Sequence, residues 1–138
     1  DKKMNFSSAA AGELHVFADA VRDIVNRSFD SFLHDDVKLA KTVEPLEACI
    51  DDINVNVKSR HIERLTTGQC TIELGFVLTD ISTNFERVSD HCSNIAGCVL
   101  EMAHASLGLH EFLSDVRRED PEYGVHYDEY ARKYALMD

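Results

Sequence analysis

Acidic side chains recur at a four-residue spacing in two separate stretches of the chain. Glu86 and Asp90 are followed at the same interval by Asn94, and Glu47 and Asp51 repeat the spacing earlier in the sequence. Residues four apart lie one above the other on the same side of an α-helix. Each stretch therefore presents a row of oxygen atoms. Such a row is either half of a metal site or an ordinary solvated face.

The two rows could converge if they lie on neighbouring antiparallel helices. Four carboxylates close together repel one another strongly and need cations between them. Ligation by oxygen alone favours Mg, Ca, Mn or ferric iron, and a contribution from His91 would widen the choice to Zn or Ni. The rows lie off the predicted apolar seams, so any metal would occupy an outer groove. Spacing alone favours the solvated face over the metal site.

Three long amphipathic helices are predicted to carry these side chains. Apolar residues recur at alternating steps of three and four over about 8–33, 37–66 and 70–106. Pro45 falls inside the second helix and predicts a kink or a restart near 42–44. Gly68 suits a left-handed cap at the end of that helix. The buried side of the third helix is predicted to comprise Ile81, Phe85, Val88, Cys92 and Ile95.

A short helix over about 121–136 should follow the third long helix, which Gly108 is expected to end. Asp120 before Pro121 is a favourable helix start, and residues 111–116 predict one or two short helical turns. An aromatic stripe runs along the tail helix and is either an intrachain packing face or a dimer face. It comprises Tyr123, Tyr127, Tyr130 and Tyr134.

No strand pattern is present. The predicted fold is therefore all-α: one domain over 1–138, built as an antiparallel three-helix bundle with a short C-terminal helical extension.

Composition excludes several classes of function. The 138-residue chain has a formal net charge of -11, which argues against nucleic acid and anionic membranes as partners. No apolar run approaches the roughly 18 residues of a membrane span, so we expect no direct membrane insertion by this segment. The four cysteines form no CxxC pair, and small buried thiols are expected. The chain opens without an initiator Met, so we expect it to be a fragment of a longer protein.

Catalytic motifs are absent from the sequence, and we predict that the protein is not an enzyme. Glu101 and His104 form one ExxH pair, the local unit of a di-iron helical oxidoreductase. Such sites require two of these pairs together with two further acids. The di-iron oxidoreductase therefore remains the weakest of the functional alternatives.

Four stretches of the sequence form a familiar pattern, namely residues 60–65, 68–70, 75–76 and 84–96, where the last range reads NFERVSDHCSNIA. They resemble the PhoU family, and more narrowly the PhoU-like domain at the C-terminal end of bacterial sodium/phosphate cotransporters. Residues 47–51 match the acidic motif of the family, and 130–136 resemble the end of those transporters. The similarity covers roughly 37–136.

This resemblance implies a three-helix bundle that carries metal ions, commonly iron or zinc, in paired acidic motifs on its surface. The implied ligands are Glu47 and Asp51 on the second helix and Glu86 and Asp90 on the third, with Asn94 as an addition. It further implies a regulatory role in phosphate homeostasis without catalysis. The domain would lie on the cytoplasmic side of the inner membrane, attached to the transmembrane part of its parent cotransporter.

The chain departs from the family pattern in one respect. Independent PhoU proteins carry two such bundles in tandem, whereas this sequence contains one and has no internal repeat. The departure favours the transporter domain over the alternative, a stand-alone PhoU-type regulator of phosphate signalling. It also predicts a homodimer, in which two copies restore the tandem arrangement.

Overall fold

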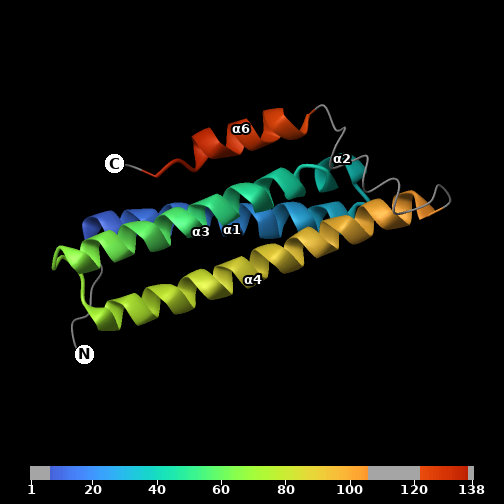
Figure 1. The fold of residues 1–138 in the computed structure, drawn as a ribbon. Helices are drawn as coiled ribbons and strands as arrows, with labels where there is room; N and C mark the ends of the chain where they lie inside the picture. Colours follow the sequence, from blue (N-terminus) through green and yellow to red (C-terminus); the bar gives the residue numbers. More distant parts are fainter. Residues whose placement is uncertain (1–6, 106–121, 137–138) are drawn as a thin grey trace.

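The computed structural model describes residues 7–105 and 122–136, and within this part the chain is all-α, with no strands. Three long helices, α1 (Ser8–Leu33), α3 (Val43–Thr66) and α4 (Ile72–Ala103), each pack against the other two. They lie side by side and successive long helices run in opposite directions (Figure 1). The one-turn helix α2 (Val37–Ala40) lies between α1 and α3, and α6 (Tyr123–Lys133) packs on α3.

Local sequence signals account for the boundaries of α1, α2 and α3. Ser7 caps α1 by accepting a hydrogen bond from the backbone N–H of Ala10, and Asp36 caps α2 in the same way. The predicted second helix restarts rather than running unbroken over 37–66, because α2 ends at Ala40 and α3 begins at Val43. This restart places Pro45 in the first turn of α3, where a missing backbone N–H costs least.

A left-handed glycine ends α3, as the sequence predicts. Gly68 has a φ of 77°, and the N–H groups of Gly68 and Gln69 donate to the carbonyl groups of Leu65 and Arg64. The chain then turns into α4, whose first turn is capped by the Thr71 hydroxyl. Helix α4 ends at Ala103, short of the predicted residue 106, and Gly108 lies outside the described residues.

The buried face of α4 differs from the predicted one. Val88 is 37% exposed, whereas Ser82 and Ser89 are fully buried. The helix is turned so that a line of small residues points into the bundle, because small side chains let α4 approach both neighbours. Of the predicted residues, Cys92 is buried, while Ile81, Phe85 and Ile95 are half-buried. Phe85 packs edge-on against Phe17 of α1 with ring centroids 4.9 Å apart.

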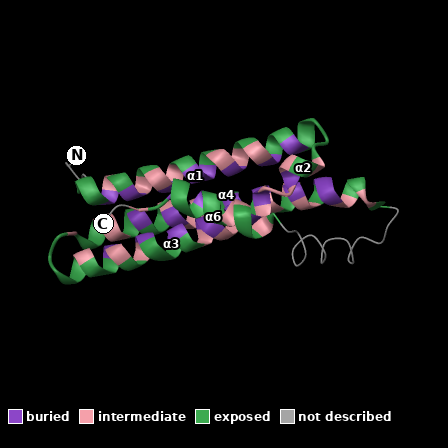
Figure 2. Cartoon of the chain, turned by 90° about the horizontal axis from the view of Figure 1, so that it is seen from above, coloured by how far each residue is buried: buried purple, intermediate pink, exposed green. Residues whose placement is uncertain are grey.

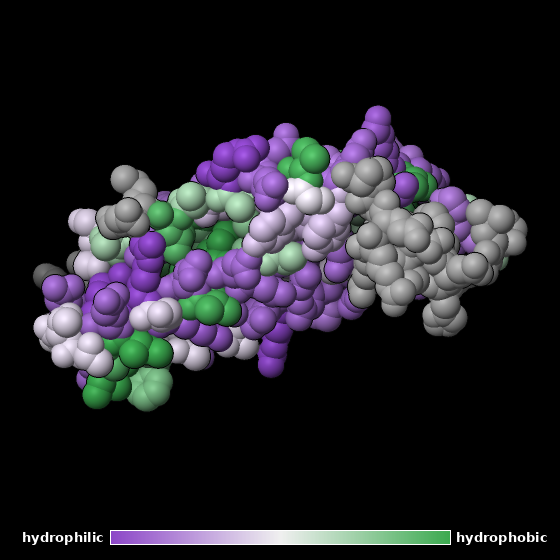
Figure 3. All heavy atoms as spheres, turned by 45° about the horizontal axis from the view of Figure 1, so that its top comes forward, coloured by the Kyte–Doolittle hydropathy of each residue, from purple (hydrophilic) through white to green (hydrophobic). Residues whose placement is uncertain are grey.

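A continuous apolar core runs between the long helices. The buried residues of each helix face its neighbours, while exposed residues cover the outer sides (Figure 2). Hydrophilic side chains dominate the face seen in Figure 3, where hydrophobic residues form separate patches. Within the described residues, no helix is long and apolar enough to cross a membrane.

The tyrosine stripe packs within the chain. Tyr130 and Tyr134 are buried, and their hydroxyls donate to the carbonyl oxygen of Thr42 and to Asp23 of α1. The hydroxyl of Tyr127 donates to Asp52 of α3. Helix α6 is therefore fastened across α1 and α3 by the phenol groups. Asp120, Pro121 and residues 111–116, for which a helix start and short turns are predicted, lie outside the described residues.

Candidate metal centre

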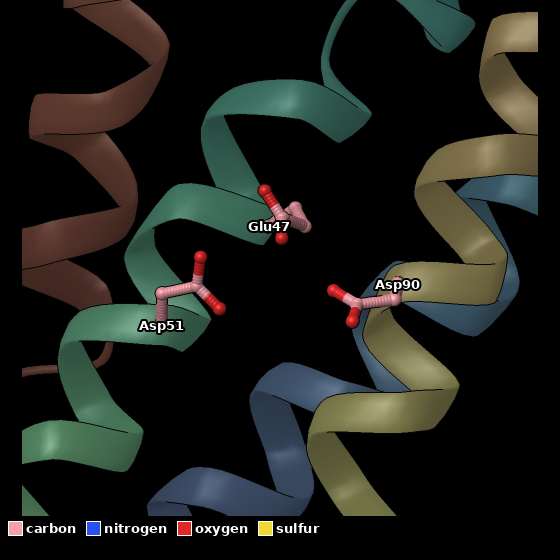
Figure 4. Close-up of side chains that lie close together, drawn as sticks. All are labelled: Glu47, Asp51 and Asp90. Carbon is pink, nitrogen blue, oxygen red and sulfur yellow. The ribbon is translucent and has the colours of Figure 1, made fainter.

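Three carboxylates from two helices face one another in the groove between α3 and α4. Glu47 and Asp51 stand one turn apart on α3, and Asp90 points at them from α4 (Figure 4). One oxygen from each of the three residues lies within 4.8 Å of the others. The two four-residue spacings allow such a convergence, and three of the four acids that they identify take part in it. It exists because α3 and α4 pack against each other in opposite directions, which brings the beginning of α3 beside the second half of α4.

Burial, together with repulsion within the cluster, changes the protonation of Glu47. Burial raises the pKa of Glu47 to about 8, helped by the negative charges of Asp51 and Glu44 and by a hydrogen bond with Asp90. Near neutral pH, Glu47 therefore holds a proton that an exposed glutamate would have lost. The proton relieves part of the repulsion, which is the role that a cation would otherwise perform.

Glu86, another predicted ligand, lies beside this cluster. It is half-buried on α4, one turn before Asp90, and it is not among the three residues whose oxygen atoms converge. Burial raises the pKa of Asp51, and the charge of Glu86 is the next largest cause. Glu86 therefore contributes to the field at the site, from a position just outside the group of converging oxygens.

Asn94 and His91 are further from taking part in the cluster. Both side chains are exposed on α4. No hydrogen bond between described residues joins the amide of Asn94 to the cluster, and His91 is not part of the group. Asn94 stays a predicted ligand, and in this arrangement the donor set consists of carboxylate oxygens.

Glu44 is a contributor that the spacing argument missed. It lies one turn before Glu47 on α3, and its charge raises the pKa of Glu47. One of its oxygen atoms accepts a hydrogen bond from the Ser93 hydroxyl of α4 at 3.1 Å. A three-residue spacing also keeps side chains on one side of a helix, so Glu44 could have been found by including that interval.

The donor set fits a cation. Within the described residues, no Lys or Arg forms an ion pair with Glu47, Asp51 or Asp90. Neighbouring Asp52 is turned the other way, toward Tyr127 of α6. Carboxylate oxygens from two helices at this separation could close on one ion between them. The site is thus a concentrated negative charge at a helix–helix contact.

The di-iron alternative gains no support in the described part of the chain. Glu101 is half-buried and His104 caps the end of α4. Among the described residues, the cluster of Glu47, Asp51 and Asp90 is the one group of three or more His, Cys, Asp or Glu side chains close enough to share an ion. Glu101 and His104 do not join such a group.

The fold and the site define an all-α helical-bundle protein with a cluster of acids between two of its helices. The family described as the PhoU domain matches residues 14–99, a range that contains α3, the cluster and most of α1 and α4. The chain therefore belongs to the PhoU family. It is also 29% identical over 93 residues to the phosphate-specific transport system accessory protein PhoU homolog 1 of Thermotoga maritima.

The match with this relative is partial on both sides. It covers 67% of the present chain but 40% of the relative. No solved structure matches the chain significantly. The family membership thus rests on the sequence matches, and the helical bundle described above agrees with it.

Proposed function

We propose that this chain is a PhoU-like regulatory domain that controls phosphate uptake, without catalytic activity of its own. The observation that carries the proposal is the match of 14–99 to the PhoU domain, because this range includes the acidic cluster at the contact of α3 and α4. The relative from Thermotoga maritima bears a name that places it in a phosphate-specific transport system. A regulatory bundle needs a point at which a signal changes its structure, and the cluster supplies one.

The cluster is proposed to hold metal through Glu47, Asp51 and Asp90, with Glu86 beside it and Asn94 one turn further on. The resemblance favours Fe or Zn, while the oxygen donors also suit Mg, Ca, Mn or, with His91, Ni. A cation here would neutralise the carboxylates and displace the proton held by Glu47. It would also tie α3 to α4, so that metal loading and the packing of these two helices become linked.

The context proposed for this domain is the cytoplasmic side of the inner membrane, as part of a sodium/phosphate cotransporter whose transmembrane part it contacts. In this arrangement the three long helices are a single PhoU-like antiparallel bundle. A homodimer would then supply the second bundle. Light scattering on the purified chain tests this pairing: a mass of two chains supports it, and a strict monomer at high concentration contradicts it.

A stand-alone PhoU-type regulator fits the same observations equally well. The aligned part of the Thermotoga maritima relative is 40% of that protein, and its name describes an accessory protein of a transport system. The two alternatives share the regulatory role and differ in the transporter that is controlled.

Uptake of radioactive phosphate tests the role and separates the alternatives. Cells that lack the gene are compared with cells that carry the native gene, Asp90→Asn, or the control Asp80→Asn, which changes an exposed acid of the same helix. We expect deletion and Asp90→Asn to alter the response of uptake to external phosphate, and Asp80→Asn to leave it intact. If the uptake that loses its control requires sodium, the result supports the cotransporter domain. If that uptake does not require sodium, the result supports the stand-alone regulator. Unaltered control in the deletion strain contradicts both.

A further inference from the structure

A cysteine–histidine pair lies at the end of the bundle where α3 turns into α4. The Sγ atom of Cys70 is 3.3 Å from Nδ1 of His61, within hydrogen-bonding distance for sulfur. The thiol has a second acceptor, the carbonyl oxygen of Thr71 at 3.5 Å. His61 is 9% exposed, whereas Cys70 is only half-buried. The sulfur is therefore reachable from solvent, while the imidazole that can accept its proton is enclosed.

The imidazole of His61 packs closely against a glycine of α4. A Cβ atom on Gly75 of α4 would lie 2.5 Å from Nε2 of His61, so the ring occupies the space that any other residue at position 75 would fill. With Nε2 packed against α4, Nδ1 is directed at the sulfur. The pair thus depends on a close approach between α3 and the start of α4. It is therefore part of the packing of these two helices.

A pocket of about 290 Å³ opens beside the pair. Cys70, His61 and Arg64 line it together with Ser7 and Ala10 from the beginning of α1. The volume lies near the lower end of the range for small-molecule sites. Its position at the joint between α1, α3 and α4 means that a group attached to Cys70 would lie against all three long helices.

Arg64 gives the pocket a preference for acidic reagents. Its terminal nitrogens donate to Glu13, but its buried Nε has no hydrogen-bond partner among the described residues. A guanidinium group thus forms part of the pocket wall in a chain whose formal net charge is -11, and a small carboxylate would be attracted to it.

We propose that Cys70 is a modification site for small acidic disulfides, with which its sulfur undergoes thiol–disulfide exchange. His61 Nδ1 accepts the thiol proton, and the thiolate attacks one sulfur of the reagent. A bond forms between Cys70 and that sulfur as the bond between the two reagent sulfurs breaks. The second half of the reagent leaves as a thiolate and takes the proton from His61. Cys70 is oxidised and the leaving sulfur is reduced, so no other oxidant is required.

A metal site is the weaker interpretation of this pair. A tetrahedral zinc site takes three or four protein ligands, and within the described part of the chain no third His, Cys, Asp or Glu joins Cys70 and His61. The pair is also remote from the acidic cluster. Along α3, Glu47 and His61 are about 21 Å apart at the helical rise per residue. Modification at Cys70 is therefore independent of the proposed metal site and of the proposed function.

The chain contains its own control thiols. Cys98 is exposed on α4, and no histidine contact to its sulfur occurs among the described residues, whereas Cys49 and Cys92 are buried. Exposure alone predicts that Cys98 reacts first. The proposal predicts the reverse order, because Nδ1 of His61 lies within hydrogen-bonding distance of the Cys70 sulfur and the pocket opens beside it.

Oxidised glutathione on the intact, reduced chain tests the proposal, with each cysteine followed by mass spectrometry after peptide digestion. We expect Cys70 to be modified about tenfold faster than Cys98. The ratio of the rate at Cys70 to the rate at Cys98 should be smaller with the neutral reagent bis(2-hydroxyethyl) disulfide. In urea the two rates should be equal. A reducing agent should restore the thiol. Equal rates at the two sites, or faster modification of Cys98, would overturn the proposal on the native chain alone.

Two variants examine the role of His61. His61→Gln should lower the rate at Cys70 to that at Cys98 while leaving Cys98 unchanged. Since His61 is buried, Gly75→Ala offers a second route, because the added methyl group displaces the ring without removing it. If both variants keep the helical circular dichroism and Cys70 still reacts faster than Cys98, His61 does not act on the sulfur and the proposal is wrong.

Discussion

Carboxylates at helix contacts are accommodated in two different ways in this molecule. Glu13 of α1 is 6% exposed and accepts hydrogen bonds from Arg60 and Arg64 of α3 at 3.1 to 3.2 Å. Glu47, Asp51 and Asp90, in contrast, face one another between α3 and α4. The first carboxylate is neutralised by the chain itself. Those in the second group have no such cation among the described residues.

The contrast distinguishes an acid that stabilises the fold, Glu13, from a group of acids that could bind a cation. A buried carboxylate that two guanidinium groups satisfy leaves nothing for an external cation to bind. A cluster of acids without cations is costly as it stands, and it lowers that cost by holding a proton or by binding an ion. Burial and like charge raise the pKa of Glu47 to about 8, which indicates that the metal-free cluster relies on a proton.

The largest effect is expected at the paired acid. Glu13→Gln removes the charge that both arginines contact and leaves Arg64, which is 11% exposed, without its counter-charge. The free energy of unfolding should fall by about 3 kcal/mol, as for other broken buried ion pairs. Urea unfolding measures this change. Asp19→Asn, which breaks the exposed pair with Arg22 on the same helix, is the control and should change stability by less than about 1 kcal/mol.

The stability of the metal-free protein should fall as the pH rises from about 5 to about 8. The folded state holds a proton on Glu47 that the unfolded state loses near its ordinary pKa of 4.5. Over this window the folded state binds more protons, so raising the pH favours unfolding. The loss attributable to the cluster should be about 2 kcal/mol, which is less than the full pKa shift would give because solvent screens the half-buried Glu47. It is obtained by subtracting the profile of Glu47→Gln. If the difference in unfolding free energy between the native chain and Glu47→Gln stays constant over this pH range, the pKa of Glu47 is not raised.

Neutralising one acid of the cluster should have the opposite sign to neutralising Glu13. Glu47→Gln keeps the shape of the side chain and removes its charge, so at pH 8.5 without metal the protein should gain about 1 kcal/mol of stability. Thermal unfolding in the presence of a chelator measures the gain. The matched control is Glu63→Gln, which changes an exposed acid of the same helix and should have little effect. If Glu47→Gln destabilises the protein, the charge of Glu47 stabilises the fold, as the charge of Glu13 does, and the contrast between the two sites is wrong.

Helix positions were predictable because each helix carries its own signals. The apolar period, the caps at Asp36 and Gly68 and the interruption near Pro45 are local, and α1 and α3 follow them closely. The rotation of α4 was not predictable from the same pattern. Its buried face is decided by how closely its neighbours approach, which favours Ser82 and Ser89 over the larger residues beside them.

The acidic cluster was partly predictable for a similar reason. The four-residue spacing identifies which acids share one side of a helix, and opposite helix directions bring the two rows together. The spacing does not fix the register between α3 and α4, which sets Asp90 against Glu47 and leaves Glu86 at the edge. The pairing of Glu13 with two arginines joins residues about fifty positions apart, and no local pattern predicts it.

Metal binding by the native chain and by Asp90→Asn tests the central claim most directly. Both proteins are purified without an affinity-metal step, stripped with a chelator and titrated with Zn, Fe(II) or Mn, and bound metal is measured by mass spectrometry. Asp80→Asn is the control. We predict that the native chain and the control bind metal and release protons on binding, and that Asp90→Asn loses most of this affinity. Equal binding by all three proteins, or none by the native chain, would return Glu47, Asp51 and Asp90 to an ordinary solvated groove.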